Sequence, residues 1–470
     1  MTKRSTTIAL AAAALLAGCS FIPTYERPTA PVPATYATTS GQTSAAPAVP
    51  WQNYFAEPRL QRLIEAALAN NRDLRVAMLN IEQARATFQV RRADVYPGVG
   101  VAANASRAPA TGTGDLTNSF NVGLAISAWE IDFFGRIASL KEQALAQYLA
   151  TEEGRNAAQV SLVAAVANGW LNLLADEELL GLSRQTLASR EESVRLTQLR
   201  LDAGVASALD FRQAQSLTQA AKATLAQQQR QRALDENALA LLLGQALPDD
   251  VRASLAGGRL ADAPTMAALP AGLPSDLLTR RPDIRQAEQQ LMGANANIGA
   301  ARAAFFPRIA LTTQAGTASG ELSGLFTSGS WGFSIAPSLL LPIFDAGRNQ
   351  ANLDSAQAGR GIAIAQYEKA IQTAFREVSD ALAGQATLGE QAQAQQLQAE
   401  AESARLQLAD LRYRNGVSSY LDLLDAQRSL FAAQQAVVQV RLAQLQNQVS
   451  LYKALGGGAP PDTTTADKPS

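Results

Sequence analysis

Residues 199–216 read LRLDAGVASALDFRQAQS, and residues 411–428 read LRYRNGVSSYLDLLDAQR. Both stretches contain a Gly-Val step, a serine two residues later and then a Leu-Asp pair, 212 positions apart. Glycine at this place is typical of a helix C-terminus, and a serine three residues before an acid has the spacing of a capping box. Each stretch therefore predicts a tight turn between two antiparallel helices.

The repeat extends over most of the chain. Residues 72–97 resemble residues 282–307 at a shift of 210, and residues 131–136 resemble residues 343–348 at a shift of 212. Such a long period indicates duplication of one unit, because solenoid repeats are only about 20–50 residues long. We expect a signal peptide (1–18), a Pro-rich extended segment (19–55), a first repeat (56–245), an inter-repeat connection (246–274), a second repeat (275–456) and a flexible tail (457–470).

Alternating apolar residues predict four β-strands, two in each repeat. In SFNVGLAISAW, residues 119–129, apolar side chains occupy every second position from Phe120 to Ala128, and WGFSIAPSLLL at 331–341 repeats the pattern. An ordinary surface hairpin over a core has a similar pattern, but strands of about ten residues also match those of membrane barrels. We expect strands at about 96–107, 118–131, 307–316 and 331–343, with a lipid-facing side that contains Phe120, Leu124, Phe333 and Ile335.

Four strands are too few to close a membrane barrel, since known barrels start at about eight strands. An open sheet edge is also excluded in lipid, because each unpaired N–H or C=O group costs several kcal/mol there. If the strands cross a membrane, several chains must therefore share one barrel. Two copies would supply eight strands, and three copies would supply twelve.

Long segments without proline predict very long helices at 137–201 and 349–412, each roughly 90 Å at 1.5 Å per residue. In the last predicted helix, apolar residues recur every seven positions, which is the period of coiled-coil packing, at Leu424, Phe431, Val438, Leu445 and Tyr452. The expected fold class is α+β: an internally duplicated chain with long coiled-coil helices and four transmembrane β-strands.

The composition excludes several classes of function. Among 470 residues, 40 Lys and Arg stand against 41 Asp and Glu, so the net charge of -1 gives no electrostatic basis for nucleic-acid binding. The absence of histidine removes the commonest general base and metal ligand, and a single cysteine excludes an intrachain disulfide and a cysteine-based metal site. We therefore expect no enzyme activity, no cofactor and no metal.

The single cysteine, Cys19, follows a secretory signal. Lys3 and Arg4 precede a short apolar run that ends in LAGC at 16–19. LAGC resembles a bacterial lipobox, which implies that Cys19 becomes the lipidated first residue of the mature chain. An ordinary signal peptide with a chance cysteine is the alternative. Ser20 is the usual residue for sorting to the outer membrane, and the Pro-rich residues beyond it should run extended as a tether.

Four passages resemble the TolC-type outer-membrane factor family, in its lipidated drug-efflux branch: LAGC, LPSDLLTRRPDIRQAE (273–288), IFDAGR (343–348) and YRNGVSSYLDLLDAQRSLF (413–431). The resemblance implies a homotrimer whose twelve strands form an outer-membrane barrel. An α-helical tunnel, with a mixed equatorial layer, would continue the barrel through the periplasm. The implied partners are a periplasmic adaptor (membrane fusion protein), an inner-membrane RND pump and outer-membrane lipid.

In that family, acids of the second-copy turn narrow the pore at its periplasmic end. The resemblance implies this role for Asp422 and Asp425, a hydrophobic ring for Leu421, and a tip-tying role for Arg428. It also implies inter-helix contacts for Asp210 and Tyr413, but Ser418 stands where some members have an arginine. Helix capping is the alternative for the acids Asp210 and Asp422, and a solvated surface pair is the alternative for Asp425 with Arg428.

The function expected from these observations is a passive exit duct for drugs or other small molecules in a tripartite efflux pump. A duct for type I protein secretion or heavy-metal efflux is the alternative within the family. A periplasmic coiled-coil lipoprotein scaffold is the alternative from another class. The alternating strands argue against a scaffold, because an adaptor or scaffold needs no lipid-facing strands.

Overall fold

The computed structural model describes residues 20–36, 49–109, 114–263, 266–267, 269, 272 and 274–458. The expected signal peptide, Cys19 and most of the expected tail lie outside these residues. The chain divides into two compact units that are described separately. The first comprises residues 1–29, 79–152 and 286–369, and the second comprises residues 30–78, 153–285 and 370–470.

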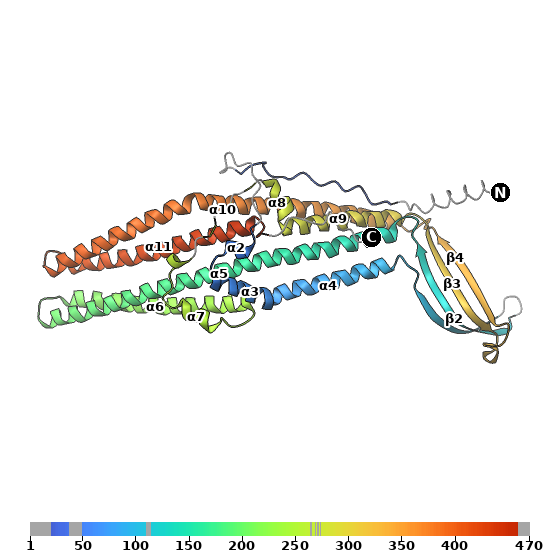
Figure 1. Ribbon diagram of the computed structural model, residues 1–470, viewed down its shortest axis with the longest axis horizontal. Helices are drawn as coiled ribbons and strands as arrows, with labels where there is room; N and C mark the ends of the chain where they lie inside the picture. The colour runs from blue at the N-terminus through green and yellow to red at the C-terminus, as the bar shows by residue number, and fades with distance from the viewer. Residues whose placement is uncertain are drawn as a thin grey trace. The chain divides into compact units, whose positions relative to one another are not determined.

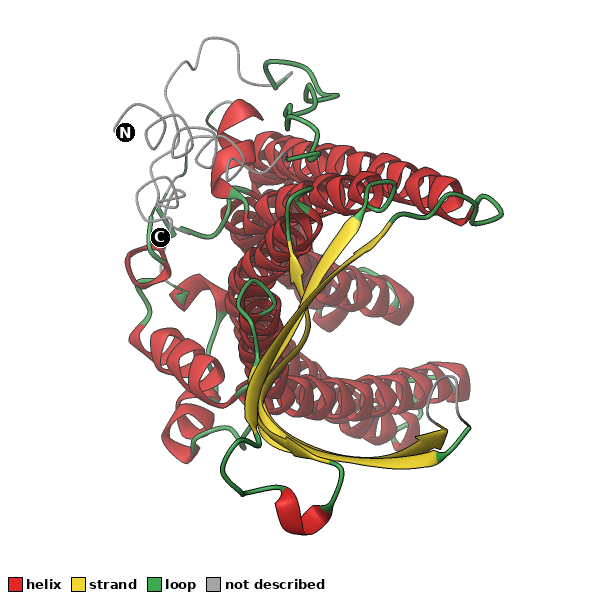
Figure 2. Cartoon of the chain, turned by 90° about the vertical axis from the view of Figure 1, so that its right-hand side faces the viewer, coloured by secondary structure: helices red, strands yellow, loops and turns green. Residues whose placement is uncertain are grey.

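The first unit contains an antiparallel sheet whose strands follow chain order (Figure 1). Its strands are β1 (Val99–Pro109), β2 (Leu116–Ile131), β3 (Arg308–Ser319) and β4 (Trp331–Leu340); each overlaps a predicted strand, and β1, β2 and β3 extend two or three residues beyond the predicted ends. The central strands β2 and β3 come from different repeats, so their pairing joins the two halves of the chain in one sheet. The sheet is strongly curved (Figure 2).

The register gives the sheet one apolar and one polar face. One row across the apolar face consists of Val101, Leu124, Ala315 and Phe333. On the other face, Asn121 Oδ1 accepts hydrogen bonds from Asn104 Nδ2 at 3.1 Å and from Gln314 Nε2 at 3.0 Å. Because side chains alternate between faces along each strand, the predicted apolar side is one continuous surface across the sheet.

The predicted alternation in β2 is wrong at Ala128. The register shifts between Ile126 and Trp129, so β2 has one more residue than β3 at this point. Ala128 has a φ of 48°, and its N–H donates to Thr312 Oγ1 at 3.2 Å. The extra residue is a β-bulge that returns Trp129 to the face occupied by Ile126, and a hydrophobic pattern alone does not reveal it.

β2 and β3 approach each other very closely at Gly123 and Gly316, which pair directly. A Cβ on Gly316 would lie 2.2 Å from the Val122 carbonyl oxygen, and a Cβ on Gly123 would lie 2.4 Å from the Ala315 oxygen. No side chain fits at these distances. The seam between the repeats therefore requires glycine on both strands.

Equivalent helices of the two repeats have nearly equal lengths. The pairs are α4 (Arg72–Ala93) and α9 (Pro282–Ala303) with 22 residues each, α5 (Arg136–Asp202) and α10 (Arg348–Arg414) with 67 each, and α6 (Ala208–Leu243) and α11 (Tyr420–Ala454) with 36 and 35. Shorter helices are α2 (Trp51–Tyr54), α3 (Pro58–Asn70), α7 (Asp249–Leu255) and α8 (Pro274–Arg280). The predicted long helices and the internal duplication are confirmed.

The main core of the second unit includes residues of α3, α5, α6, α7 and α11. Trp170 of α5 is 1% exposed and belongs to a cluster with the buried side chains of Leu63, Ile64, Leu239 and Leu243. Val438 and Tyr452, two members of the predicted seven-residue repeat, belong to the same core. One window of α5 is apolar enough to cross a membrane, but 50% of it is buried in the protein, which fits a core helix.

The RRPDIR sequence at 280–285 supplies two buried arginines, Arg281 and Arg285, that form ion pairs in the second unit. Arg281 donates to Asp283 at 2.6 Å, to Glu377 of α10 at 2.7 Å and to the Ala454 carbonyl at 3.1 Å. Arg285 contacts Glu153 of α5 at 2.5 Å. Since a buried charge left without its partner costs about 3–5 kcal/mol, these pairs fix the start of α9 against its neighbours.

The residues that follow Cys19 run extended along α9 in the first unit. Asn295 Nδ2 donates to the Pro23 carbonyl at 2.7 Å, and the Phe21 ring stacks on Phe306 with centroids 4.6 Å apart. Arg27 donates two hydrogen bonds to the Glu288 carboxylate, at 2.7 and 2.9 Å. The predicted tether is therefore fastened to α9 as a strap, which we define as residues 20–27.

Replacing Gly316 by alanine should destabilise the sheet by about 1–3 kcal/mol, because the new Cβ overlaps a backbone oxygen. Gly332→Ala is the matched control, since Gly332 pairs with Gly316 but has open space around a Cβ. Folded protein can be quantified from its mobility in unheated detergent gels. Equal folded yields for the two variants would contradict the close approach of β2 and β3.

Candidate functional site

Two helical hairpins, α5–α6 and α10–α11, end in turns formed by the repeated stretch. Gly204 and Gly416 have φ angles of 73° and 69°, in the left-handed region that favours glycine. In both turns, the N–H of the following valine donates at 2.9 Å to a carbonyl of the preceding helix. These bonds satisfy carbonyls at the helix end, and the predicted turns are confirmed.

Both predicted capping boxes are present. Asp422 Oδ2 accepts hydrogen bonds from Ser419 N at 3.1 Å and Ser419 Oγ at 2.9 Å, and Asp422 N donates to Ser419 Oγ at 3.2 Å. Ser207 and Asp210 form the same three bonds, at 2.7 to 3.1 Å. Within one chain, the carboxylates of Asp210 and Asp422 therefore cap α6 and α11.

Asp425 lies one turn further along α11 and binds two arginines. Arg405 of α10 donates to its Oδ2 at 2.6 Å, and Arg428 donates to its Oδ1 at 3.2 Å. Arg405 also donates to Glu402 at 3.1 Å. The hydrogen bond from Arg405, with a further contribution from Arg428, lowers the pKa of Asp425, so this carboxylate stays ionised at neutral pH.

The sequence predicted a contact between Asp425 and Arg428 but not the shorter one with Arg405. A signal was available, because Arg405 and Asp425 each lie ten positions from Asn415 in the turn. Antiparallel helices joined by a short turn place such equidistant positions side by side. Both side chains of the Arg405–Asp425 pair are 47% exposed, so the pair orients charge more than it stabilises the fold.

An apolar cluster connects the two hairpins near their turns. It contains Ala214 of α6 together with Tyr420, Leu423 and Leu424 of α11. The Tyr413 ring packs beside it, 5.3 Å from the Tyr420 ring and 4.8 Å from the Arg200 guanidinium. Burial raises the pKa of the Tyr413 hydroxyl; Arg200 opposes this rise, and Asp210 adds to it. The negative charge of Asp210 therefore acts on the Tyr413 hydroxyl, although the tyrosine ring lies against Arg200.

Leu421 lies at the first turn of α11 and is 55% exposed. Its equivalent in the first repeat, Leu209, is 66% exposed. Together with Asp422, Asp425 and Arg428, Leu421 forms an accessible surface at the end of the α10–α11 hairpin. Because the apolar side chain of Leu421 is already exposed at the helical tip, it can contact another protein surface without a conformational change.

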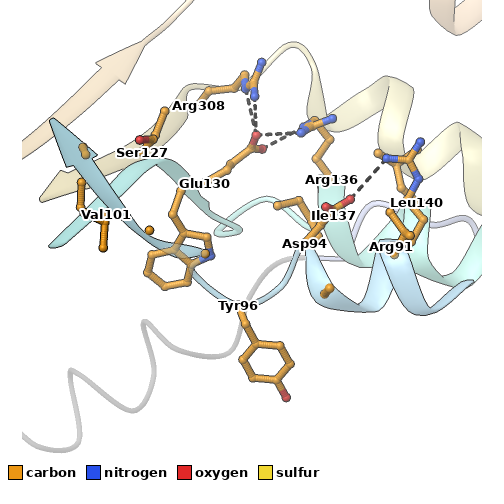
Figure 3. Close-up of a pocket in the computed structure, with 18 residues that line it drawn as sticks. Arg91, Asp94, Tyr96, Val101, Ser127, Glu130, Arg136, Ile137, Leu140 and Arg308 are labelled. Carbon is orange, nitrogen blue, oxygen red and sulfur yellow. Dashed lines mark hydrogen bonds and ion pairs between the residues drawn. The ribbon is translucent and has the colours of Figure 1, made fainter. Parts of the chain in front are cut away.

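A second polar cluster, which the sequence did not predict, lies at the base of the sheet (Figure 3). Glu130 at the end of β2 accepts hydrogen bonds from Arg136 of α5 at 2.7 and 2.8 Å, and from Arg308 of β3 at 2.6 and 3.0 Å. The cluster borders a cavity of about 670 Å³ whose lining includes Tyr96 and Trp129. One carboxylate held by two guanidiniums fastens β2 to β3, and we call this cluster the Glu130 clasp.

The chemistry of these clusters is that of holding and orienting charge. Among the described residues, no group of three or more His, Cys, Asp or Glu side chains could hold a metal ion. Asp210 and Asp422 cap helices, whereas Asp425 and Glu130 bind arginines. The arrangement therefore suits a structural or conducting role.

The model of the outer membrane efflux protein family matches residues 63–245 and 273–457. The chain is 47% identical over 470 residues to the probable efflux pump outer membrane protein TtgC of Pseudomonas putida, covering 97% of this chain and 96% of that protein. It is 44% identical over 458 residues to the outer membrane protein OprJ of Pseudomonas aeruginosa, covering 96% and 95%.

Among solved structures, the open state of the Neisseria gonorrhoeae MtrE outer membrane channel is 43% identical, with a TM-score of 0.84 over 94% of this chain and 98% of that chain. A membrane protein from Pseudomonas aeruginosa is 44% identical, with a TM-score of 0.86 over 93% and 97%. The predicted family, α+β fold and outer-membrane location are confirmed, and the chain belongs to the outer membrane efflux protein family.

Proposed function

We propose that three copies of the chain form the outer-membrane exit duct of a tripartite efflux pump. The observation that carries this proposal is the sheet, which has one apolar face, one polar face and two edges that pair with no other strand of the described residues. Three such sheets close a twelve-stranded barrel with its apolar face toward lipid and its polar face toward a water-filled lumen. The long helices continue the duct into the periplasm.

The relatives support small organic molecules as the cargo. Proteins of Pseudomonas putida that are 47% identical to the chain are named as outer membrane proteins of antibiotic and toluene efflux pumps. A passive duct receives its cargo from the pump, so the matching partners are an inner-membrane RND pump and a periplasmic adaptor. Transport of proteins or of metal ions has no comparable support.

The strap supports a lipid anchor at Cys19. Phe21, two residues after Cys19, stacks on Phe306, which lies two residues before β3 begins at Arg308. The strap therefore brings Phe21 to the level at which β3 starts. A diacylglycerol on Cys19, two residues before Phe21 in the sequence, would anchor the chain in the membrane next to the barrel.

The tip of the α10–α11 hairpin supports a gate. Leu421, Asp422, Asp425 and Arg428 lie on this tip, and threefold symmetry turns each of them into a ring. A ring of ionised carboxylates attracts cations and resists close approach of the three tips. Arg405 and Arg428 offset this repulsion at Asp425, so they set how tightly the tips close.

Arginine at Leu124 should reduce the amount of assembled protein, at a cost of about 2–4 kcal/mol near the middle of the bilayer. Ser334→Arg is the matched control, because Ser334 lies on the polar face, opposite Gln314. The measurement is the folded fraction in isolated outer membranes. Equal losses for both variants would show that the apolar face does not meet lipid.

Replacing Cys19 by alanine, with a cleavable signal peptide, should abolish labelling by radioactive palmitate. The protein should remain in the outer-membrane fraction, because the barrel holds it there without the lipid. Recovery of the variant as a soluble periplasmic protein would refute the barrel.

In planar bilayers, purified protein should conduct ions, and multivalent cations added on the periplasmic side should block the current. Asp425→Asn should weaken the block several-fold, because it removes one ring of charge. Arg405→Ala should strengthen the block, because it frees the Asp425 carboxylate from its shorter ion pair.

Arg195→Ala is the control for the tip variants, since Arg195 forms a still more exposed pair with Glu192 on α5. Its block should equal that of the unmodified protein. If cations block the current equally in Arg405→Ala, Asp425→Asn and the control, Asp425 is not part of the gate.

A further inference from the structure

Arg190 of α5 is a buried arginine that forms no ion pair with any of the described residues. It is 7% exposed, its Nε is buried without a hydrogen-bond partner, and its Nη1 donates to the Leu217 carbonyl oxygen of α6 at 3.1 Å. Buried charges in proteins are normally paired, because an ion taken out of water loses its solvation. The charge of Arg190 is therefore uncompensated within the described part of the chain.

The acids next to Arg190 in the sequence bind other cations. Glu191 pairs with Lys222 at 3.2 Å, and Glu192 pairs with Arg195 at 2.5 Å. Both of these pairs lie at exposed positions of the helices. Neither carboxylate is available to Arg190 in this arrangement.

The second repeat has a paired acid at the position equivalent to Arg190. Glu402 of α10 lies 212 positions after Arg190 and accepts a hydrogen bond from Arg405 at 3.1 Å. The first-repeat equivalent of Arg405 is Ser193, which carries no charge. The first repeat thus places a cation at this position of the helix and supplies no counter-charge beside it.

Arg190 lines a cavity of about 120 Å³ whose walls come from α5, α10 and α11. The other polar side chains of the lining are amides and hydroxyls, on Gln185, Thr186, Ser189, Gln427 and Gln434, and the described lining contains no Asp or Glu. The Gln427 Oε1 atom is buried and also lacks a hydrogen-bond partner. Because a water molecule takes up about 30 Å³ in the liquid, the cavity has room for about four waters or for one small oxyanion.

The charges around this cavity favour an anion. Burial, together with the positive charge of Arg428, lowers the pKa of the Arg190 guanidinium, which remains a cation because arginine keeps its proton in proteins. Repulsion from Arg428 thus adds to the unfavourable burial of an unpaired charge. A bound anion would offset both effects.

The side chains of the lining match an oxyanion that carries a hydroxyl group. A guanidinium donates two parallel hydrogen bonds to such an anion, and the hydroxyls of Thr186 and Ser189 can donate to its other oxygens. The P–OH group of hydrogen phosphate can in turn donate to Gln427 Oε1, which a halide cannot do. We propose that this cavity is a binding site for a small hydroxyl-bearing oxyanion such as hydrogen phosphate.

The site connects the two helical hairpins of one copy. Arg190 belongs to the α5–α6 hairpin, whereas Gln427 belongs to the α10–α11 hairpin. An anion that binds both residues holds the hairpins together and reduces the repulsion between Arg190 and Arg428. The site follows from contacts within a single chain and does not depend on the proposed duct.

Thermal unfolding of the purified protein in detergent tests the site, with inorganic phosphate as the probe. Gluconate, an anion too large for the cavity, replaces phosphate so that the ionic strength stays constant. The unfolding midpoint should rise with phosphate and reach a plateau at least about 2 °C higher, since a ligand that binds the folded state stabilises it.

Arg190→Met should abolish this response. In gluconate alone, the midpoint of this variant should exceed that of the unmodified protein, because the unpaired buried charge is gone. Arg190→Lys keeps the charge but lacks the planar guanidinium, so half of the response should need at least about tenfold more phosphate. The lysine variant also keeps the test decisive if Arg190→Met does not fold.

Arg184→Gln is the matched control, because Arg184 is an exposed arginine on the same helix. It should keep the full phosphate response. If the Arg190 variants respond to phosphate as the unmodified protein does, phosphate acts only through the bulk solvent and the site is refuted. The absence of a response in the unmodified protein also refutes it, and an equal response to chloride overturns the assignment to an oxyanion.

Discussion

Each free edge of the four-stranded sheet exposes a row of backbone N–H and C=O groups that lipid cannot hydrogen-bond. Water can satisfy such an edge, but the apolar face of this sheet extends across all four strands through Val101, Leu124, Ala315 and Phe333. A surface of this kind belongs in a membrane, where the edges must pair. The edges and the apolar face together make a single copy incomplete, and assembly completes it.

The two repeats share most of their backbone structure, and the residues that differ between them mark the parts with a special role. Both turns keep the left-handed glycine and the capping box, because any helical hairpin of this kind needs them. The charged cluster of Arg405, Asp425 and Arg428 exists in the second repeat alone, since Ser193, Gln213 and Ser216 occupy the equivalent positions in the first. Two hairpins with the same backbone thus carry different surfaces, which fits the proposal that one tip of each copy lines the pore.

Sequence reasoning predicted the features that depend on local order. Period-two alternation revealed β2, segments free of proline revealed α5 and α10, and serine–acid spacing revealed both capping boxes. It did not reveal Arg405 beside Asp425, the Glu130 clasp, or the bulge at Ala128. These features depend on which distant segments meet, and a pattern along one strand or helix does not contain that information. Similarly, the sequence does not distinguish Gly123 and Gly316 from other small residues, because the need for glycine arises only from the pairing of β2 with β3.

The central claim is that one chain cannot complete its own sheet and that three copies do so. Native mass measurement of the mature protein, extracted in a mild detergent that preserves outer-membrane assemblies, tests it most directly. We predict one species with the mass of three chains, without a monomer in equilibrium at low concentration. A folded monomer that keeps its sheet while embedded in detergent would contradict the account, because its edges would then be stable without a partner.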